Sequence, residues 1–143
     1  MTPLSARLAA VVDALPLKPG LRVLEIGGAG GATARAVAER IPGGHILMID
    51  RSATSIKQAS KAAADEIDAG VMRVREVAAE QFQLLPGEEP FDLAFAIRVG
   101  AFDGRHPSSG RIALQRITAA LTPEGRMFID TGDPLHELDL PRS

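Results

Sequence analysis

The chain has 143 residues, of which 45% are hydrophobic, with a formal net charge of −2 at pH 7 and no cysteine. This length predicts one domain over residues 1–143, and the absence of a basic surplus argues against nucleic acid and anionic membranes as partners. The lack of cysteine excludes disulfides, thiolate nucleophiles and cysteine-ligated metals. Because the N-terminus lacks a signal-peptide pattern and the apolar runs are too short to cross a bilayer, we expect a cytoplasmic protein.

The spacing of apolar residues predicts helices and strands that alternate along the chain. The first half of the chain is expected to form a helix from a Thr2 and Pro3 start to Leu15, a strand over 21–26, a helix over 33–41 and a strand over 45–50. A helix from a Ser52 cap to Gly70, a strand over 71–77, a loop over 78–90 and a strand over 91–99 follow. The last elements are a turn-rich connection over 100–110, a helix capped by Ser108 or Ser109 and running to Leu121, a turn over 122–125 and a strand over 126–131.

Five strands that alternate with helices indicate crossover units and a mostly parallel sheet. Right-handed crossovers place helices on both faces, which gives a Rossmann-like three-layer α/β/α fold. The alternating segment 71–77 is typical of a half-exposed edge strand, whereas 91–99 is apolar on both faces and is expected in the centre. In such sheets ligands bind beyond the carboxyl ends of the strands.

A glycine-rich segment lies where that rule places a ligand, between the first strand and the next helix. It contains Gly27, Gly28, Gly30 and Gly31. Glycine permits positive φ in a tight turn and close approach of the backbone to a ligand, and the following helix offers free N–H groups. We therefore expect this turn to bind a cofactor.

An acidic residue at the end of the second strand points to a nucleoside. Asp50 follows Gly31 by 19 residues. A carboxylate at this place commonly accepts hydrogen bonds from a ribose diol. Such charged hydrogen bonds contribute roughly 1.5–3 kcal/mol.

Glu25 distinguishes between nucleoside ligands. A dinucleotide turn follows the pattern G-x-G-x-x-G, but from Gly28 the third glycine position is Thr33, and no P-loop ending is present. A carboxylate two residues before the first glycine would repel a pyrophosphate, whereas it would attract a cationic amino-acid group. A nicotinamide-dependent oxidoreductase is therefore a weaker alternative.

The segment "VLEIGGAGG" resembles the first motif of class I S-adenosylmethionine-dependent methyltransferases. Glu25, Gly27 and Gly31 match that motif, and Ala29 replaces its middle glycine. "HILMIDRS" is similar to the second-strand motif ending in the ribose-binding acid, and "VREVAAEQFQLLP" to the adenine-contacting segment, with Ala79 where the family usually has an acid. "FDLAFAIRV" and "ALTPEGRMFIDTGDP" resemble the fourth strand and the turn into the fifth. The resemblance covers residues 20–133.

The resemblance implies a small bacterial methyltransferase with S-adenosyl-L-methionine as its cofactor. It also implies the strand order 3-2-1-4-5. The implied cofactor-binding residues are Glu25, Gly27, Gly28, Ala29, Gly31, Asp50, Arg51, Ala79, Glu80 and Arg98.

The family usually adds two more strands, so a five-stranded sheet reads as truncated at the C-terminus. We expect the open edge of the sheet to be covered by the tail "LHELDL" or by another subunit, which makes a homodimer plausible.

Methyl transfer from a sulfonium is an in-line displacement that needs alignment and, for hydroxyl or ammonium acceptors, a base. The loops after the fourth and fifth strands offer candidate side chains: Arg98, Asp103, Arg105, His106, Asp130 and Asp133. His106 and Asp133 are the weak catalytic candidates. The other histidines show no metal-ligand spacing, and no metal is expected. An Asn/Asp-Pro-Pro-Tyr type motif is absent, which argues against DNA adenine methylation.

The sequence thus predicts S-adenosylmethionine-dependent methyl transfer to a small-molecule acceptor. Two alternatives remain open: a non-catalytic S-adenosylmethionine-binding module or partner subunit, and an NAD(P)-dependent oxidoreductase.

Overall fold

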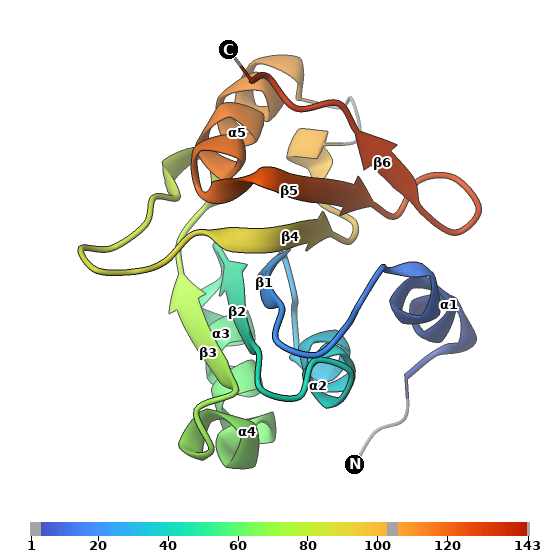
Figure 1. The fold of residues 1–143 in the computed structure, drawn as a ribbon, viewed down its shortest axis with the longest axis vertical. Helices are drawn as coiled ribbons and strands as arrows, with labels where there is room; N and C mark the ends of the chain where they lie inside the picture. Colours follow the sequence, from blue (N-terminus) through green and yellow to red (C-terminus); the bar gives the residue numbers. More distant parts are fainter. Residues whose placement is uncertain (1–3, 103–105, 143) are drawn as a thin grey trace.

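A mixed sheet forms the middle layer of the protein in the computed structural model, which describes residues 4–102 and 106–142. Its strands lie in the order β3-β2-β1-β4-β5-β6 (Figure 1). Neighbouring strands pair in parallel except β5 and β6, which are antiparallel. The strands are β1 Arg22–Ile26, β2 His45–Asp50, β3 Met72–Glu76, β4 Phe91–Ala96, β5 Leu121–Ile129 and β6 His136–Leu138.

Helices cover both faces of this sheet. The α-helices are α1 Ala6–Ala14, α2 Ala32–Glu39, α3 Ala53–Ala62, α4 Ala64–Asp68 and α5 Pro107–Ala119, and two short 3-10 helices are η1 Ala79–Gln81 and η2 Gly100–Phe102. The helices α1, α2 and α3 bury residues such as Val12 and Val37 against one face of the sheet. Residues of α5 and η1, among them Ile117 and Ala79, pack on the other face. The expected Rossmann-like three-layer fold is confirmed.

Side chains of β1 alternate between the two faces, which decides where its acidic residue lies. Val23 belongs to the core under α1 and α2, whereas Leu24 and Ile26 belong to the core under α5. Because neighbouring residues of a strand point to opposite faces, Glu25 lies on the same face as Val23. The carboxyl group is therefore carried toward α1 and α2.

The order 3-2-1-4-5 is confirmed, with β3 at one edge and β4 inside the sheet. The expectation of five strands was short by one, because residues of the tail form β6 and pair with β5. Arg126 of β5 donates two hydrogen bonds to Glu137 of β6, at 2.8 and 3.0 Å. The tail thus covers the edge of β5, and that edge no longer argues for a homodimer.

Several expected element boundaries were wrong. The first helix begins at Ala6, where the hydroxyl of Ser5 accepts a hydrogen bond from the Leu8 N–H at 3.2 Å; Thr2 and Pro3 lie outside the described residues. The expected single helix to Gly70 is broken at Ala63, whose φ and ψ are −103° and 23°. The last helix starts at Pro107 rather than after Ser108, because proline at the first helical position is favourable.

The expected turn over 122–125 was also wrong, since these residues belong to β5. The pairing of β4 with β5 shifts register between Phe91 and Leu93, whose partners are Leu121 and Arg126. Such an irregularity accommodates extra residues within a strand. None of the helices in residues 4–102 and 106–142 is long and apolar enough to cross a membrane.

Candidate functional site

The turn between β1 and α2 uses its glycines for different reasons. Gly27 and Gly31 have φ of 77° and 87°, values that residues with a side chain rarely adopt. At Gly28 a Cβ would lie 2.4 Å from Cγ of Met48, so this position has no space for a side chain. At Gly30 no atom of the described residues lies within 4 Å of an added Cβ. Backbone conformation therefore requires glycine at positions 27 and 31, and close packing requires it at position 28, whereas neither requires it at position 30.

Ala29 occupies the centre of this turn with a positive φ of 49°. Its N–H donates a hydrogen bond to Oδ2 of Asp50 at 3.2 Å. This contact holds the left-handed conformation of Ala29 and joins the turn to the end of β2. The backbone conformation explains why the related motif prefers glycine at this position.

Asp50 is oriented by two backbone groups. Besides the bond from Ala29, its Oδ1 accepts a hydrogen bond from the N–H of Ser52 at 2.9 Å. Each carboxylate oxygen can accept more than one hydrogen bond. The half-buried carboxylate therefore keeps acceptor capacity while its position is fixed.

Glu25 is a buried acid without a complete set of partners. It is 1% exposed, and its Oε1 has no hydrogen-bond partner among the described residues. Burial, and secondarily the charge of Asp50, raise the pKa of Glu25 from 4.5 to about 8. The carboxyl group is thus mostly neutral at pH 7 in the free protein. An unpaired buried polar atom costs about 1–3 kcal/mol, which a cationic ligand would offset.

Two adjoining cavities surround the turn. The larger, of about 420 Å³, is lined by Ile26, Gly27, Ile49, Asp50, Arg51, Val77, Ala78, Ala79, Glu80, Arg98, Val99, Gly100, His106 and Ser109. The smaller, of about 320 Å³, is lined by Leu8, Glu25, Gly27, Gly28, Ala29, Gly30, Ala32, Thr33, Ile97 and Arg98. Gly27 and Arg98 line both. Asp50, at the end of β2, thus lines the larger cavity, and the buried Glu25 of β1 lines the smaller.

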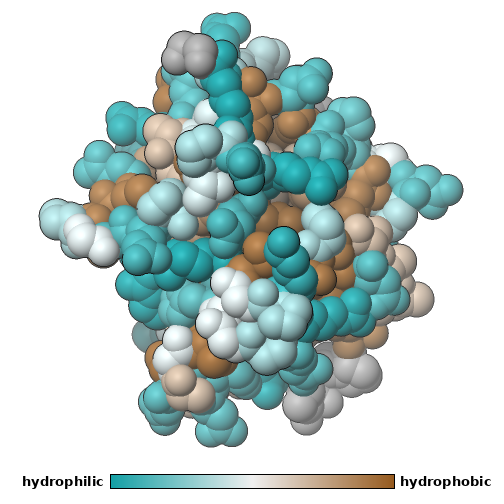
Figure 2. Space-filling model, viewed as in Figure 1, coloured by the Kyte–Doolittle hydropathy of each residue, from teal (hydrophilic) through white to brown (hydrophobic). Residues whose placement is uncertain are grey.

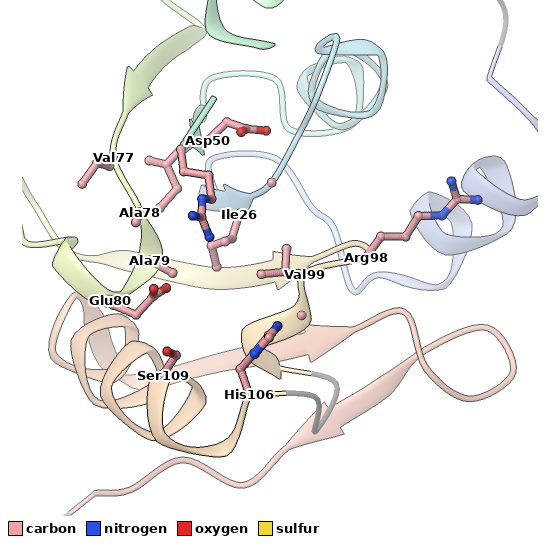
Figure 3. A pocket seen from close by; sticks show the side chains of 14 residues that line it. Ile26, Asp50, Val77, Ala78, Ala79, Glu80, Arg98, Val99, His106 and Ser109 are labelled. Atoms are coloured by element: carbon pink, nitrogen blue, oxygen red, sulfur yellow. The ribbon is translucent and has the colours of Figure 1, made fainter. Parts of the chain in front are cut away.

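Polar residues lie on both sides of the larger cavity. Figure 3 shows Asp50 on one side and Glu80, Ser109 and His106 on the other. His106 is the N-cap residue of α5, and its side chain makes no capping hydrogen bond. The connection between β4 and α5 therefore brings a histidine to the cavity.

Arg98 has a strained backbone where the cavities meet. Its φ is 57°, and its N–H donates a hydrogen bond to Oδ1 of Asp130 at 3.1 Å. Its side chain points away from the larger cavity toward α1 (Figure 3). The guanidinium therefore lies on the side of the smaller cavity, which α1 lines through Leu8.

The predicted site residues mostly come together at these cavities. The larger contains Gly27, Asp50, Arg51, Ala79, Glu80, Arg98 and His106, and the smaller contains Glu25, Gly27, Gly28, Ala29 and Arg98. Gly31 lines neither cavity but is the left-handed N-cap of α2. Asp133 lines neither and is exposed; Asp103 and Arg105 lie outside the described residues.

Some lining residues carry no sequence signal. Leu8 comes from α1, which no motif connects with the glycine turn, and Ser109 lies in the first turn of α5. Thr33 is 5% exposed and lies in the first turn of α2. Within residues 4–102 and 106–142, no three His, Asp or Glu side chains gather as a metal ion would require.

Comparisons with known proteins agree with this geometry. Residues 24–127 match a family described as "Methyltransferase domain". No curated protein matches the chain.

Solved structures with similar folds are larger proteins. An S-adenosylmethionine-dependent methyltransferase from Thiobacillus denitrificans, in complex with S-adenosyl-L-homocysteine, is 22% identical with a TM-score of 0.66, covering 90% of this chain and 49% of that one. Phosphoethanolamine N-methyltransferase 1 of Haemonchus contortus is 18% identical with a TM-score of 0.72, covering 87% of this chain and 25% of that one. The cyclase SpnF is 21% identical with a TM-score of 0.68, covering 85% and 42%. This chain thus spans half or less of the length of each.

Proposed function

Because the chain belongs to the methyltransferase domain family, we propose that it binds S-adenosylmethionine in its two adjoining cavities and transfers a methyl group to a small-molecule acceptor. The observation that carries the proposal is the pair of acids on either side of one glycine turn. Asp50 offers oriented oxygens to the larger cavity, and Glu25 lines the smaller one with a buried oxygen that has no partner in the described part of the chain.

The chemistry of these donors fits the parts of the cofactor. Asp50 suits a ribose diol, since both of its oxygens are held by backbone N–H groups. The η1 segment suits the adenine: Ala79 supplies apolar surface and backbone, and Glu80 a polar edge. Arg51 lies on the same cavity, where its stem can cover a flat ring.

The smaller cavity suits the amino-acid portion. An ammonium group would supply the partner that Oε1 of Glu25 lacks, and the guanidinium of Arg98 suits a carboxylate. Gly27, Gly28 and Ala29 form the wall between these groups, and Gly31 fixes the start of α2 behind them. The residues present therefore fit this cofactor.

Bound S-adenosylmethionine supplies an electrophilic methyl group on a sulfonium. The protein must hold the acceptor in line with that group and exclude water. His106 is our candidate to take a proton from a hydroxyl or ammonium acceptor, since it lines the larger cavity. Asp133, the other sequence candidate, lies in an exposed turn and contributes no side chain to either cavity.

A small-molecule acceptor in the cytoplasm is the partner that we propose, because the net charge of −2 gives no general attraction to nucleic acid or anionic membranes. The two alternatives differ in how the site supports them. The likeness to the cyclase is one of fold, so binding of S-adenosylmethionine without methyl transfer stays the first alternative. An NAD(P)-dependent oxidoreductase is disfavoured, since Glu25 would face the pyrophosphate and the buried Thr33 replaces the third glycine.

Calorimetric titration with S-adenosylmethionine, S-adenosylhomocysteine and NAD tests the proposal. We expect micromolar binding of the first two and none of NAD. Asp50→Ala should weaken binding tenfold or more, about 1.4 kcal/mol. Asp68→Ala, an exposed acid of α4, is the matched control and should bind like the wild type. Binding of NAD alone would contradict the proposal. Transfer of an isotope-labelled methyl group to a panel of small acceptors then separates catalysis from binding alone.

A further inference from the structure

We propose that Asp130 is a positioning residue for the smaller cavity, because its carboxylate joins two walls of that cavity. One wall is the loop after β4, represented by Arg98, and the other is the first half of α1. The inference rests on the proposed function, in which this cavity receives the amino-acid portion of the cofactor. Asp130 itself lines neither cavity.

The first contact fixes a strained backbone. Arg98 adopts a φ of 57°, a left-handed conformation that is unfavourable for a residue with a side chain. The N–H of Arg98 donates to Oδ1 of Asp130 at 3.1 Å, which stabilises this conformation. Because Arg98 lines both cavities, the path of its backbone shapes their junction.

The second contact holds α1 in place. Arg7 forms an ion pair with Oδ2 of the same carboxylate. The Asp130 side chain is only 9% exposed but that of Arg7 is 44% exposed, so this pair is shielded from solvent on one side only. Arg7 immediately precedes Leu8, the α1 residue that lines the smaller cavity. Figure 1 shows α1 beyond the carboxyl ends of β4 and β5, the strands that Arg98 and Asp130 follow in the chain.

The rest of α1 is anchored differently, which makes the contribution of Asp130 specific. Val11, Val12 and Leu15 are buried in the core at the other end of the helix. The first turn carries no such buried residue; Leu8 is half-buried. Loss of the carboxylate should therefore leave the fold intact while loosening the cavity wall and the loop of Arg98. Since Asp130 lines neither cavity, it acts through these two neighbours and not on the reacting atoms.

Calorimetric titration with S-adenosylhomocysteine tests this role. Asp130→Ala should weaken binding about tenfold, the order expected from releasing one strained residue and one partly shielded ion pair. Asp130→Asn keeps an oxygen for the Arg98 N–H and should lose less. Asp13→Ala is the matched control: it removes another α1 carboxylate, paired with Arg40 on the exposed side, and should change affinity less than twofold.

A double-mutant cycle with Arg98→Gly separates positioning from general destabilisation. Glycine adopts positive φ without strain, so the loop then needs Asp130 less. In this background Asp130→Ala should weaken binding only about threefold, a non-additivity that a merely structural residue would not give. Equal losses in both backgrounds overturn the inference.

A second readout needs no ligand. Hydrogen exchange at the N–H of Ala9, which bonds the carbonyl of Ser5, should accelerate in Asp130→Ala and in Arg7→Gln but not in Asp13→Ala. If the wild type binds S-adenosylhomocysteine and Asp130→Ala binds equally well, the inference is overturned. If the wild type binds none, the proposed function fails instead, whatever the exchange data give. If Asp130→Ala does not fold, Asp130→Asn and Arg7→Gln decide the question by the same comparison.

Discussion

The buried carboxyl group of Glu25 should make the stability of the free protein depend on pH. Its pKa is raised from 4.5 to about 8, chiefly by burial, so between these values the folded chain holds a proton that the unfolded chain has lost. The free energy of unfolding must then fall as pH rises through this interval, by about 1.4 kcal/mol per pH unit. The interval spans about 3.5 pH units, so above it the free energy of unfolding should be lower by about 5 kcal/mol than below it. At pH 7 the loss in the free energy of unfolding should be about 3 kcal/mol.

The variant Glu25→Gln isolates this effect, since glutamine resembles the neutral acid in shape and does not titrate. Urea unfolding at pH 5, 6, 7 and 8, followed by circular dichroism because the chain has no Trp or Tyr, gives both stabilities. We expect near equality at pH 5 and a growing advantage of Glu25→Gln toward pH 8. Glu39→Gln removes an exposed carboxylate and controls for the lost charge. A difference between wild type and Glu25→Gln that stays constant with pH would refute the reasoning.

Three further predictions concern stability. Gly28→Ala should destabilise the fold by about 1–3 kcal/mol, because the added carbon would lie 2.4 Å from Met48, whereas Gly30→Ala has open space and should be close to neutral in urea unfolding. Glu88 is nearly buried; burial raises its pKa, but hydrogen bonds from two arginines and a backbone N–H outweigh this and lower it to about 2. Its stabilisation is therefore present above pH 4.5 and lost as pH falls toward 2, so Glu88→Gln should narrow the gap in stability between pH 6 and pH 3; an unchanged gap contradicts this. Burial lowers the pKa of His45 below 6.5, so the contribution of the neutral ring to the stability of the fold should be lost as pH falls below that value. NMR titration of the ring gives the pH at which it becomes protonated in the folded protein.

Much of the fold follows from local patterns in the sequence. The apolar run before Gly27 and the run ending at Asp50 are buried strands because both faces of a central parallel strand are covered. The resemblance to methyltransferases, which rested on these two motifs and on the segments that follow them up to residue 133, is confirmed by the family match.

The failures have physical causes beyond local patterns. Pro123 and Gly125 suggested a turn, but pairing with β4 keeps them in a strand with irregular register. The strand β6 was missed as an assigned element because three residues carry little pattern of their own, and their pairing with β5 decides their conformation.

The residues of the candidate site likewise include some that the sequence predicts and some that it does not. Glu25 and Asp50 could be found from their spacing to the glycines, since short turns fix where such residues lie. The roles of Leu8 and Asp130 could not, because they depend on contacts between α1 and the end of β5 across most of the chain. The assignment of individual cofactor contacts and of a catalytic role for His106 stays a prediction.

A crystal structure of the protein with S-adenosylhomocysteine tests the central claim most directly. We expect the ribose hydroxyls on Asp50, the adenine beside η1 and the ammonium group on Oε1 of Glu25. A ligand bound elsewhere, or one in these cavities whose ammonium group leaves Glu25 without a partner, would contradict the account.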